Sequence, residues 1–270
     1  MGVEGTYLEG IIAWHRKRAR EDSRSRTEMR KEAMAISSKT SFAQAILCDE
    51  GVSLIAECKR RSPSKGNLAT IADPVSLGTS YEKAGASAIS VLTDNEYFSG
   101  SLNDLAGISS VVAIPCLRKD FTVDEIDLYE ARIAGASAVL LIVAALDPSE
   151  LKDFIDLSSE LGLDALVEVH SAPELDQALD ANAKIIGVNQ RNLHDFTIDL
   201  NLAGRLRPFI PNGVISIVES GIHELSQIDA LLDLEFDSML VGEALVRSDD
   251  PFEKARTFVE ASRREGYRCS

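Results

Sequence analysis

The sequence has few of the features that mark specialised classes of protein. Its 270 residues include only 4 Cys, 8 Pro and 17 Gly, and no apolar run approaches the roughly 18 residues of a membrane span. Disordered, collagen-like and low-complexity chains are thereby excluded. The cysteines form no CxxC pair and have no histidine nearby at metal-ligand spacing. We therefore expect reduced structural thiols and no metal site at Cys48, Cys58, Cys116 and Cys269.

Basic residues are also in short supply. Lys and Arg number 28 against 43 Asp and Glu, which gives a formal net charge of -15. A field of this sign repels phosphate backbones and anionic membrane surfaces, so we expect neither nucleic-acid nor membrane binding. The N-terminus, with Glu4 and Glu9 ahead of a basic stretch at 15–20, lacks the order of a signal peptide, which predicts a cytoplasmic protein. An anionic ligand would need its positive contacts gathered locally.

Short β-branched apolar runs alternate with amphipathic stretches from Ser53 onward, at the spacing of βα units with a parallel sheet. Strands are expected at 53–59, 87–92, 111–117, 138–143, 164–169, 184–190, 214–219 and 238–242. Helices are expected at 74–85, 101–109, 124–135, 148–162, 172–181, 198–207, 222–235 and 251–266.

The chain also repeats itself, since residues 84–92 (AGASAISVL) are echoed by residues 134–142 (AGASAVLLI). Length alone would allow two domains, but a repeat two units apart is typical of a barrel, and a doubly wound sheet rarely reaches eight βα units. We therefore predict the α/β class: a single (β/α)8 TIM barrel over residues 53–270. Residues 1–52 are predicted to form an N-terminal helical extension packed on or over the barrel.

The extension begins with an amphipathic pattern. Leu8, Ile11, Ile12 and His15 stand at helical spacing and are followed by the basic residues at 16–20. One interpretation is a helix that packs on the barrel and exposes a solvated basic face. The other is a lid over the active site, because the charge of the segment differs in sign from that of the protein. The pattern alone does not decide between them.

Ionisable and amide side chains stand near the carboxyl ends of five predicted strands, where a parallel barrel keeps its chemistry. Side chains alternate across a strand with period two, so Glu57 and Lys59 share one face of the first strand. Each such residue taken singly could be a structural ion pair or a turn residue. Together at corresponding barrel positions they predict a site, because buried ion pairs stabilise a fold poorly. The other strands contribute Lys119, Glu168, Asn189 with Arg191, and Glu219.

Two glycine-containing loops predict a phosphate site. Residues 220–224 follow the seventh predicted strand and residues 241–245 the eighth, and each loop is expected to open a helix. In barrels these two loops commonly bind phosphate through backbone N–H groups. Residues 62–66 (SPSKG), after the first strand, could reach the same group. Gly221 or Gly242 alone could equally be a turn residue.

The run IAECKRRSPSKG at residues 55–66 resembles the signature of the indole-3-glycerol phosphate synthase family. The resemblance covers roughly residues 50–250 in order. It implies a tryptophan-pathway carboxy-lyase that converts 1-(2-carboxyphenylamino)-1-deoxyribulose 5-phosphate into indole-3-glycerol phosphate, carbon dioxide and water, with no metal or organic cofactor. The other segments that resemble the family are LTDNEYFSGS (92–101), LRKDF (117–121), LVEVH (166–170), GVNQRNL (187–193) and VESGI (218–222).

The resemblance also implies roles for individual residues. Lys119 would be the general acid for the substrate ketone, and Glu168 would serve the later proton transfer. Lys59, with Glu57 beside it, would hold the substrate carboxylate. The remaining implied positions are Asn189, Ser220 and Glu219 (near Lys59) in the polar shell; Ser62, Arg191, Gly221, Gly242 and Glu243 at the phosphate; and Phe98, Phe121 and Leu140 along the ring pocket. Proton transfer would be served by pKa values nearer neutrality than those of free Lys and Glu.

One position departs from the family pattern. Many members carry Ser after the glycine at 242, whereas this chain has Glu243. A carboxylate facing the phosphate would repel it, so we expect the side chain to turn away while its backbone N–H binds.

The alternative functions are those of another phosphate-binding barrel, such as phosphoribosylanthranilate isomerase or the tryptophan synthase α subunit, or of a non-catalytic phosphate-ligand sensor. The implied partner is a small anionic substrate, and no protein partner is implied.

Overall fold

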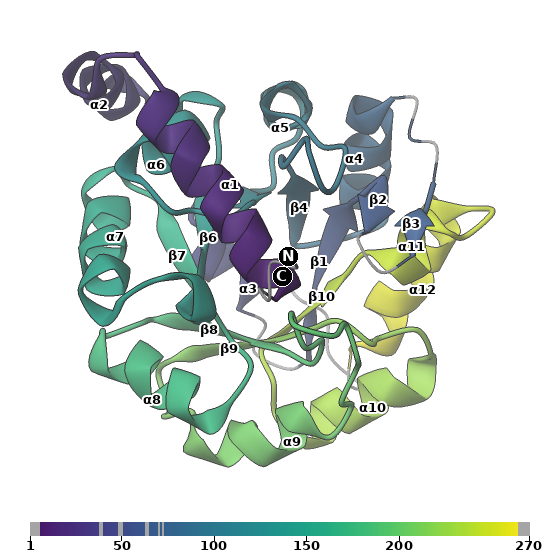
Figure 1. Ribbon diagram of the computed structural model, residues 1–270. Coiled ribbons are helices and arrows are strands. Elements are labelled where there is room, and N and C mark those ends of the chain that lie inside the picture. Colours follow the sequence, from purple (N-terminus) through teal and green to yellow (C-terminus); the bar gives the residue numbers. More distant parts are fainter. Residues whose placement is uncertain are drawn as a thin grey trace, which may run out of the picture.

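A computed structural model describes residues 6–37, 40–47, 51–62, 65–69, 71 and 73–263. Eight parallel strands close into a barrel in the order β1-β10-β9-β8-β7-β6-β5-β4, and helices surround it (Figure 1). The predicted TIM barrel is confirmed. Its strands are β1 (Ser53–Cys58), β4 (Ala88–Leu92), β5 (Cys116–Lys119), β6 (Ala138–Ile142), β7 (Asp164–Val169), β8 (Ile185–Asn189), β9 (Ile215–Glu219) and β10 (Ser238–Val241).

The outer helices begin and end where local chemistry dictates. The side chains of Asp73, Ser101 and Ser171 each accept a hydrogen bond from a backbone N–H of the first turn that follows. Gly85 and Gly135 adopt positive φ angles of 94° and 85° just after two of the helices, a conformation that glycine adopts without strain. The helices are α4 (Pro74–Lys83), α5 (Leu102–Val111), α6 (Glu125–Ile133), α7 (Pro148–Glu160), α8 (Ala172–Asp180), α9 (Leu202–Leu206), α10 (Leu225–Asp233) and α12 (Pro251–Ala261).

Several predicted boundaries were wrong. The third strand begins at Cys116 and not at 111, because α5 continues to Val111 and the N–H of Val112 still bonds the helical carbonyl of Ile108. Glu224 caps α10, so that helix cannot begin at 222. Unexpected elements are the hairpin strands β2 (Arg61–Ser62) and β3 (Gly66–Asn67) and the 3-10 turns η1 (Val143–Ala145) and η2 (Arg207–Phe209). The helix expected to open at residues 241–245 is the short α11 (Glu243–Val246).

The predicted helix at 198–207 is reduced to α9 because Ile198 pairs with Arg191 in an isolated bridge, which keeps the chain extended there. The last predicted helix ends at Ala261. Its expected end at 264–266 lies outside the described residues, as do Cys48, Cys269 and residues 63–64 of the loop after β1.

Among the described residues, the helices that precede the barrel are α1 (Tyr7–Glu21), α2 (Arg26–Ala35) and α3 (Phe42–Ile46). Helix α1 crosses the face of the barrel where the strands end (Figure 1), and its buried side chains are Leu8, Ile11, His15 and Ala19. The division at residue 52 stays a prediction.

Several basic residues of the extension pair with acidic residues at α6 and α7. Arg16 donates to both carboxylate oxygens of Glu150 at the start of α7, at 2.8 Å each. Arg18 binds Asp127 on α6. Arg26 lies 2.9 Å from the carboxylate of Asp124, the residue that caps α6. Opposite charges thus attach α1 and α2 to α6 and α7, while Lys17 and Arg20 on α1 stay exposed.

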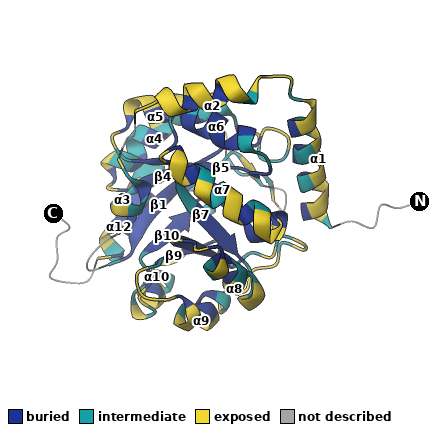
Figure 2. Ribbon diagram, turned by 90° about the vertical axis from the view of Figure 1, so that its left-hand side faces the viewer, coloured by how far each residue is buried: buried dark blue, intermediate teal, exposed yellow. Residues whose placement is uncertain are grey.

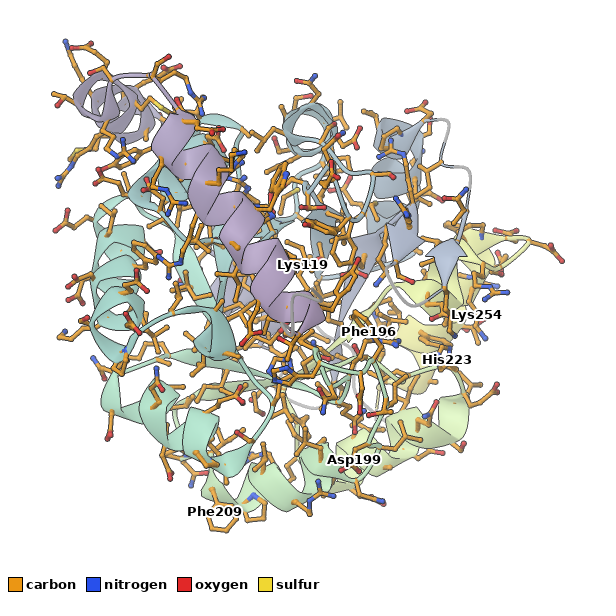
Figure 3. The ribbon with its side chains drawn as sticks, in the orientation of Figure 1. Lys119, Phe196, Asp199, Phe209, His223 and Lys254 are labelled. Carbon is orange, nitrogen blue, oxygen red and sulfur yellow. The ribbon has the colours of Figure 1, made fainter. Side chains whose placement is uncertain are left out.

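Burial follows the barrel architecture. The strands are buried almost throughout, while the outer faces of the helices are exposed (Figure 2). Lys119 lies inside the ring of helices, and Phe209 and Lys254 lie on its outside (Figure 3). Cys58 is buried, and burial raises the pKa of its thiol. Among the described residues, no helix is both long enough and apolar enough to cross a membrane.

Candidate active site

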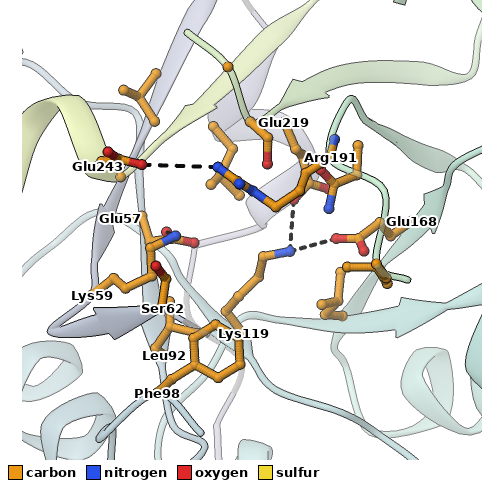
Figure 4. Close-up of a pocket in the computed structure, with 18 of the residues that line it drawn as sticks. Glu57, Lys59, Ser62, Leu92, Phe98, Lys119, Glu168, Arg191, Glu219 and Glu243 are labelled. Carbon is orange, nitrogen blue, oxygen red and sulfur yellow. Dashed lines mark hydrogen bonds and ion pairs between the residues drawn. The ribbon is translucent and has the colours of Figure 1, made fainter. Parts of the chain in front are cut away.

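An open cavity lies at the carboxyl ends of the barrel strands (Figure 4). Every residue that the sequence placed in the site lines this one cavity. The structure thus brings the candidates together, although co-location does not test their individual roles. The lining also includes residues that the sequence did not single out: Leu92, Asp94, Asp120, Ile142, Leu193, Phe196, Ile222, His223, Leu240 and Val241.

The centre of the cavity is an ion triad. Lys119, at the end of β5, directs its Nζ between Glu168 of β7 and Glu219 of β9 (Figure 4). The distances are 2.6 Å to Glu168 Oε2 and 2.7 Å to Glu219 Oε2. The two carboxylate side chains are only 1% and 2% exposed. Opposite charges are therefore held together away from water, where their interaction is strong.

The pKa values of the triad differ from the sequence expectation. Burial alone would lower the pKa of Lys119, but Glu168, Glu219 and Glu57 outweigh it and raise the pKa. Burial would raise the pKa of Glu168, yet Lys119 and His170 lower it below its usual range. Only Glu219 moves toward neutrality: burial and the nearby Glu168 raise its pKa to about 7 despite Lys119. The expected shift of both Lys and Glu toward neutrality is thus wrong for Lys119 and Glu168, because each stabilises the charged form of the other.

A second ion pair lies at the end of β1. Lys59 Nζ is 2.6 Å from Glu57 Oε1, and the Glu57 side chain is 3% exposed. The shared face predicted for these two residues is therefore seen directly. Glu219, which the sequence placed near Lys59, makes its ion pair with Lys119 instead.

Two glycines make room for these buried carboxylates. A Cβ atom at Gly187 would lie 2.2 Å from Glu219 Oε1, and one at Gly242 would lie 2.3 Å from Glu57 Oε1. Any larger residue would displace the carboxylate. The glycine at 242, which the sequence linked to phosphate, thus also has a steric reason to be there.

His170 is a neighbour of the triad that the sequence reasoning missed. Its Nε2 lies 3.3 Å from Glu168 Oε1, and its Nδ1 lies 3.1 Å from Glu174 Oε2. Burial would lower the pKa of His170, but the two carboxylates outweigh it and raise the pKa to about 9. The sequence could have indicated this neighbour, because His170 stands two residues after Glu168 and so lies on the same face of the strand.

Basic groups gather at another side of the cavity. Arg191 lies just past β8, where its backbone N–H donates to Asn189 Oδ1 at 3.0 Å and its Nη1 donates to the Phe196 carbonyl at 3.3 Å. Lys65, on the hairpin loop after β1, pairs with Glu243. Ser62, Gly221 and Gly242 line the same cavity. The loop 220–224 that contains Gly221 follows β9 and leads into α10, which begins at Leu225.

The carboxylate of Glu243 does not turn away from this cluster. Its Oε2 lies 4.0 Å from Arg191 Nη2, and its Oε1 contacts Lys65 and lies 3.4 Å from Arg247 Nη1. Burial would raise the pKa of Glu243, but Lys65 outweighs it and lowers the pKa. Arg191, Lys65 and Arg247 compensate the charge of this carboxylate, so the side chain points toward cations and not away from them.

An apolar wall faces the charged groups. The rings of Phe98 and Phe121 lie 6.2 Å apart between centroids, and Leu140 lines the same cavity. Asp94 fixes the turn that carries Phe98, because its Oδ1 accepts the N–H of Tyr97 at 2.6 Å and that of Phe98 at 2.9 Å. The cavity thus offers one flat apolar side, a cationic side, and a Lys between two Glu, which together suit an anionic aromatic substrate.

Comparison with known proteins agrees with this geometry. The family model described as indole-3-glycerol phosphate synthase matches residues 8–258. The indole-3-glycerol phosphate synthase of Chlorobium phaeovibrioides is 44% identical over 90% of this chain and 96% of that protein. The one from Mycobacterium avium is 46% identical over 92% and 90%. The fold is shared with a solved 3-hexulose-6-phosphate synthase from Salmonella typhimurium. The two chains are 14% identical, with a TM-score of 0.64 over 78% of this chain and 98% of that one.

Proposed function

This chain belongs to the indole-3-glycerol phosphate synthase family, and on that premise we propose how its cavity carries out the reaction. The enzyme converts 1-(2-carboxyphenylamino)-1-deoxyribulose 5-phosphate into indole-3-glycerol phosphate, a carboxy-lyase step of tryptophan biosynthesis. The observation that carries the mechanism is the Lys119 ammonium, held between two buried carboxylates beside an apolar wall.

The substrate has three parts, and each finds its chemical complement in the cavity. The phosphate lies with Arg191, Lys65 and the backbone around Gly221 and Gly242. The carboxyphenyl ring lies against the wall formed by Phe98, Phe121 and Leu140, and its carboxylate contacts Lys59. Figure 4 shows Arg191 with Glu243 and Phe98 with Leu92 on opposite sides of Lys119. The ketone is thereby held between the two ends, within reach of Lys119.

Lys119 acts in the first step. As the aromatic carbon that bears the carboxylate attacks the ketone carbon, a C–C bond forms and the ketone electron pair moves to oxygen. The adjacent ammonium stabilises that charge and supplies the proton that makes the hydroxyl group. The raised pKa of Lys119 keeps the side chain protonated for this role.

Glu168 and its neighbours act later. Loss of carbon dioxide returns the electron pair of the broken C–C bond to the ring and restores aromaticity. The hydroxyl then leaves as water after protonation, and a base removes the proton whose departure completes the indole double bond. Glu168, whose lowered pKa keeps it ionised, is the base. Glu219, with a pKa of about 7, can exchange a proton with Lys119 across their 2.7 Å contact.

Turnover of the open-chain substrate tests this proposal directly. Purified wild-type protein should generate indole-glycerol fluorescence together with an equal amount of carbon dioxide. Lys119→Met should bind substrate but form almost no product. Product formation without carbon dioxide release, or no product from the wild type, would refute the assigned reaction.

A further inference from the structure

Helix α1 carries one polar side chain on its buried face, and that side chain reaches the rim of the cavity. His15 is 1% exposed, whereas the other buried residues of α1 are Leu8, Ile11 and Ala19. Its Nε2 lies 2.9 Å from Asp94 Oδ2 and 3.9 Å from Asp120 Oδ1. Its ring lies 5.4 Å from that of Phe121, which lines the cavity. A buried polar group in this setting acts through its hydrogen bond.

Asp94, the partner of His15, also binds the backbone of the turn that carries Phe98. Asp94 is fully buried and uses Oδ1 for the backbone N–H groups of Tyr97 and Phe98, while Oδ2 accepts from His15. The two bonds occupy opposite oxygens of one carboxylate. A loss of the His15 donor therefore leaves a buried carboxylate oxygen unsatisfied at the turn that aims Phe98 into the cavity.

The cluster is built as a hydrogen-bond network and not as a metal site. Although ligand atoms of His15, Asp94 and Asp120 lie close enough to surround an ion, the oxygens are in use. Asp120 Oδ1 accepts the N–H of Phe121, and its Oδ2 accepts from Thr93 and Arg118. The buried guanidinium of Arg118 also neutralises Asp120 at 3.0 Å. A cation would have to displace these bonds and approach Arg118.

Aromatic side chains of α1 also contact the loops around the cavity. The Tyr7 ring lies 5.0 Å from that of Phe196, another residue of the cavity wall, and 5.9 Å from that of Tyr97. Trp14 lies 6.1 Å from Tyr97. One face of the helix therefore touches the loop after β4 and the loop after β8, which lie on two sides of the cavity.

We propose that His15 is a positioning residue for substrate binding: its Nε2–H donor orders Asp94, and Asp94 in turn holds Phe98 against the aromatic ring of the substrate. The N-terminal helix thereby sets the affinity of the ring pocket without touching the reacting atoms. This inference rests on the proposed function for the identity of the ligand. It does not depend on that function for the structural coupling between His15 and residues 97–98.

Two substitutions separate the hydrogen bond from the packing of the ring. His15→Phe keeps an aromatic ring beside Phe121 but removes the donor. His15→Gln places an amide N–H near the position of the imidazole Nε2 and keeps the donor. Lys17→Ala is the matched control, because Lys17 lies on the same helix, its side chain is 66% exposed, and its only described ion pair is with Glu21 of that helix.

The kinetic result should be a change in KM. His15→Phe should raise KM about tenfold with kcat within about twofold of wild type, the size expected for one hydrogen bond to a charged group. His15→Gln should restore most of the affinity, and Lys17→Ala should match the wild type. An unchanged KM in His15→Phe, a loss confined to kcat, or equal defects in both His15 variants would overturn the proposal.

A second measurement keeps the test independent of turnover. Amide hydrogen exchange of Tyr97 and Phe98 should accelerate in His15→Phe but not in His15→Gln or Lys17→Ala, because Asp94 protects these two N–H groups. If the wild type forms no indole product, the proposed function fails, and the exchange rates still decide the coupling. Equal protection in all four proteins would remove His15 from any positioning role.

Discussion

Lys119→Met removes the one cation that Glu168 and Glu219 share and leaves an unbranched apolar side chain in its place. The variant loses the proton donor for the ketone, and general acid catalysis contributes about 10²- to 10⁴-fold. It also leaves Glu219, 2% exposed, without its cation, and Glu168, 1% exposed, with only His170 beside it. We therefore expect turnover to fall by at least that range while the protein becomes less stable at neutral pH.

The stability loss has a calculable pH dependence. Breaking a buried ion pair on one side costs about 3 to 5 kcal/mol. Protonation of Glu168 limits the penalty, because holding a carboxyl group neutral against an ordinary pKa of 4.5 costs about 3.4 kcal/mol at pH 7 and about 2.0 at pH 6. In the wild type the lowered pKa of Glu168 contributes stability above its unfolded pKa and loses it on acidification. The deficit of the variant should therefore shrink by about 1.4 kcal/mol from pH 7 to pH 6.

Urea unfolding at several pH values measures this deficit, and indole fluorescence measures turnover. Lys152→Met is the control, because Lys152 pairs with Asp156 on α7 with both side chains about 60% exposed, and such a pair contributes about 0 to 1 kcal/mol. Retention of more than about a third of wild-type turnover would remove Lys119 from the chemical step. A deficit independent of pH would show that the carboxylates do not take up a proton, and the electrostatic reasoning would be wrong.

Glu168→Gln keeps the shape of the side chain but removes the late base, so single-turnover experiments should show carbon dioxide release ahead of indole formation; simultaneous release at one reduced rate would assign Glu168 to an earlier step. Arg191→Ala should raise KM more than it lowers kcat, because the phosphate is remote from the bond that forms, and a larger loss in kcat would contradict the assignment. Glu243→Gln should lower KM about fivefold, since the carboxylate competes with phosphate for Lys65 and Arg191; a raised KM would show that Glu243 orients these cations for the ligand. The pKa of Glu219 rises from 4.5 to about 7 on folding, so this residue contributes stability that is present below pH 4.5 and is lost as pH rises through 7. Glu219→Gln should therefore reduce the change in unfolding free energy between these pH values by up to about 3 kcal/mol. An unchanged pH dependence of the unfolding free energy would refute the raised pKa.

Hydrophobic pattern and spacing sufficed for the barrel, because its strands are largely buried and every crossover between them returns a parallel strand. They failed where tertiary contacts override local preference. The apolar run at 111–114 has the composition of a strand, yet its first residue completes α5 and is 53% exposed. The hairpin β2–β3 has two residues per strand, which is too short for any periodic signal.

The site was predictable in membership but only partly in pairing. The period of two and the barrel topology place Glu57, Lys59, Lys119, Glu168 and Glu219 at one rim, and they put Glu57 beside Lys59 on one face. They do not predict that Glu219 shares Lys119 with Glu168, since that depends on strand register and barrel shear. The role of α1 could not be predicted either. The helical spacing of His15 indicates that the side chain is buried, but it does not identify Asp94 as its partner or Phe98 as the residue that Asp94 holds.

The charge balance of the site explains why the pKa of Glu219 is raised toward neutrality. Two ammonium groups, Lys59 and Lys119, face three buried carboxylates, Glu57, Glu168 and Glu219. Lys59 pairs with Glu57, whereas Lys119 is shared by Glu168 and Glu219. One of these two negative charges is therefore only partly compensated in a medium of low dielectric constant, and its protonation costs least. Glu219 carries this excess, because its Oε1 has no hydrogen-bond partner among the described residues, whereas Glu168 also faces His170. A site built with one surplus carboxylate can therefore hold or release one proton near pH 7 without disturbing the charged lysine that the first step requires.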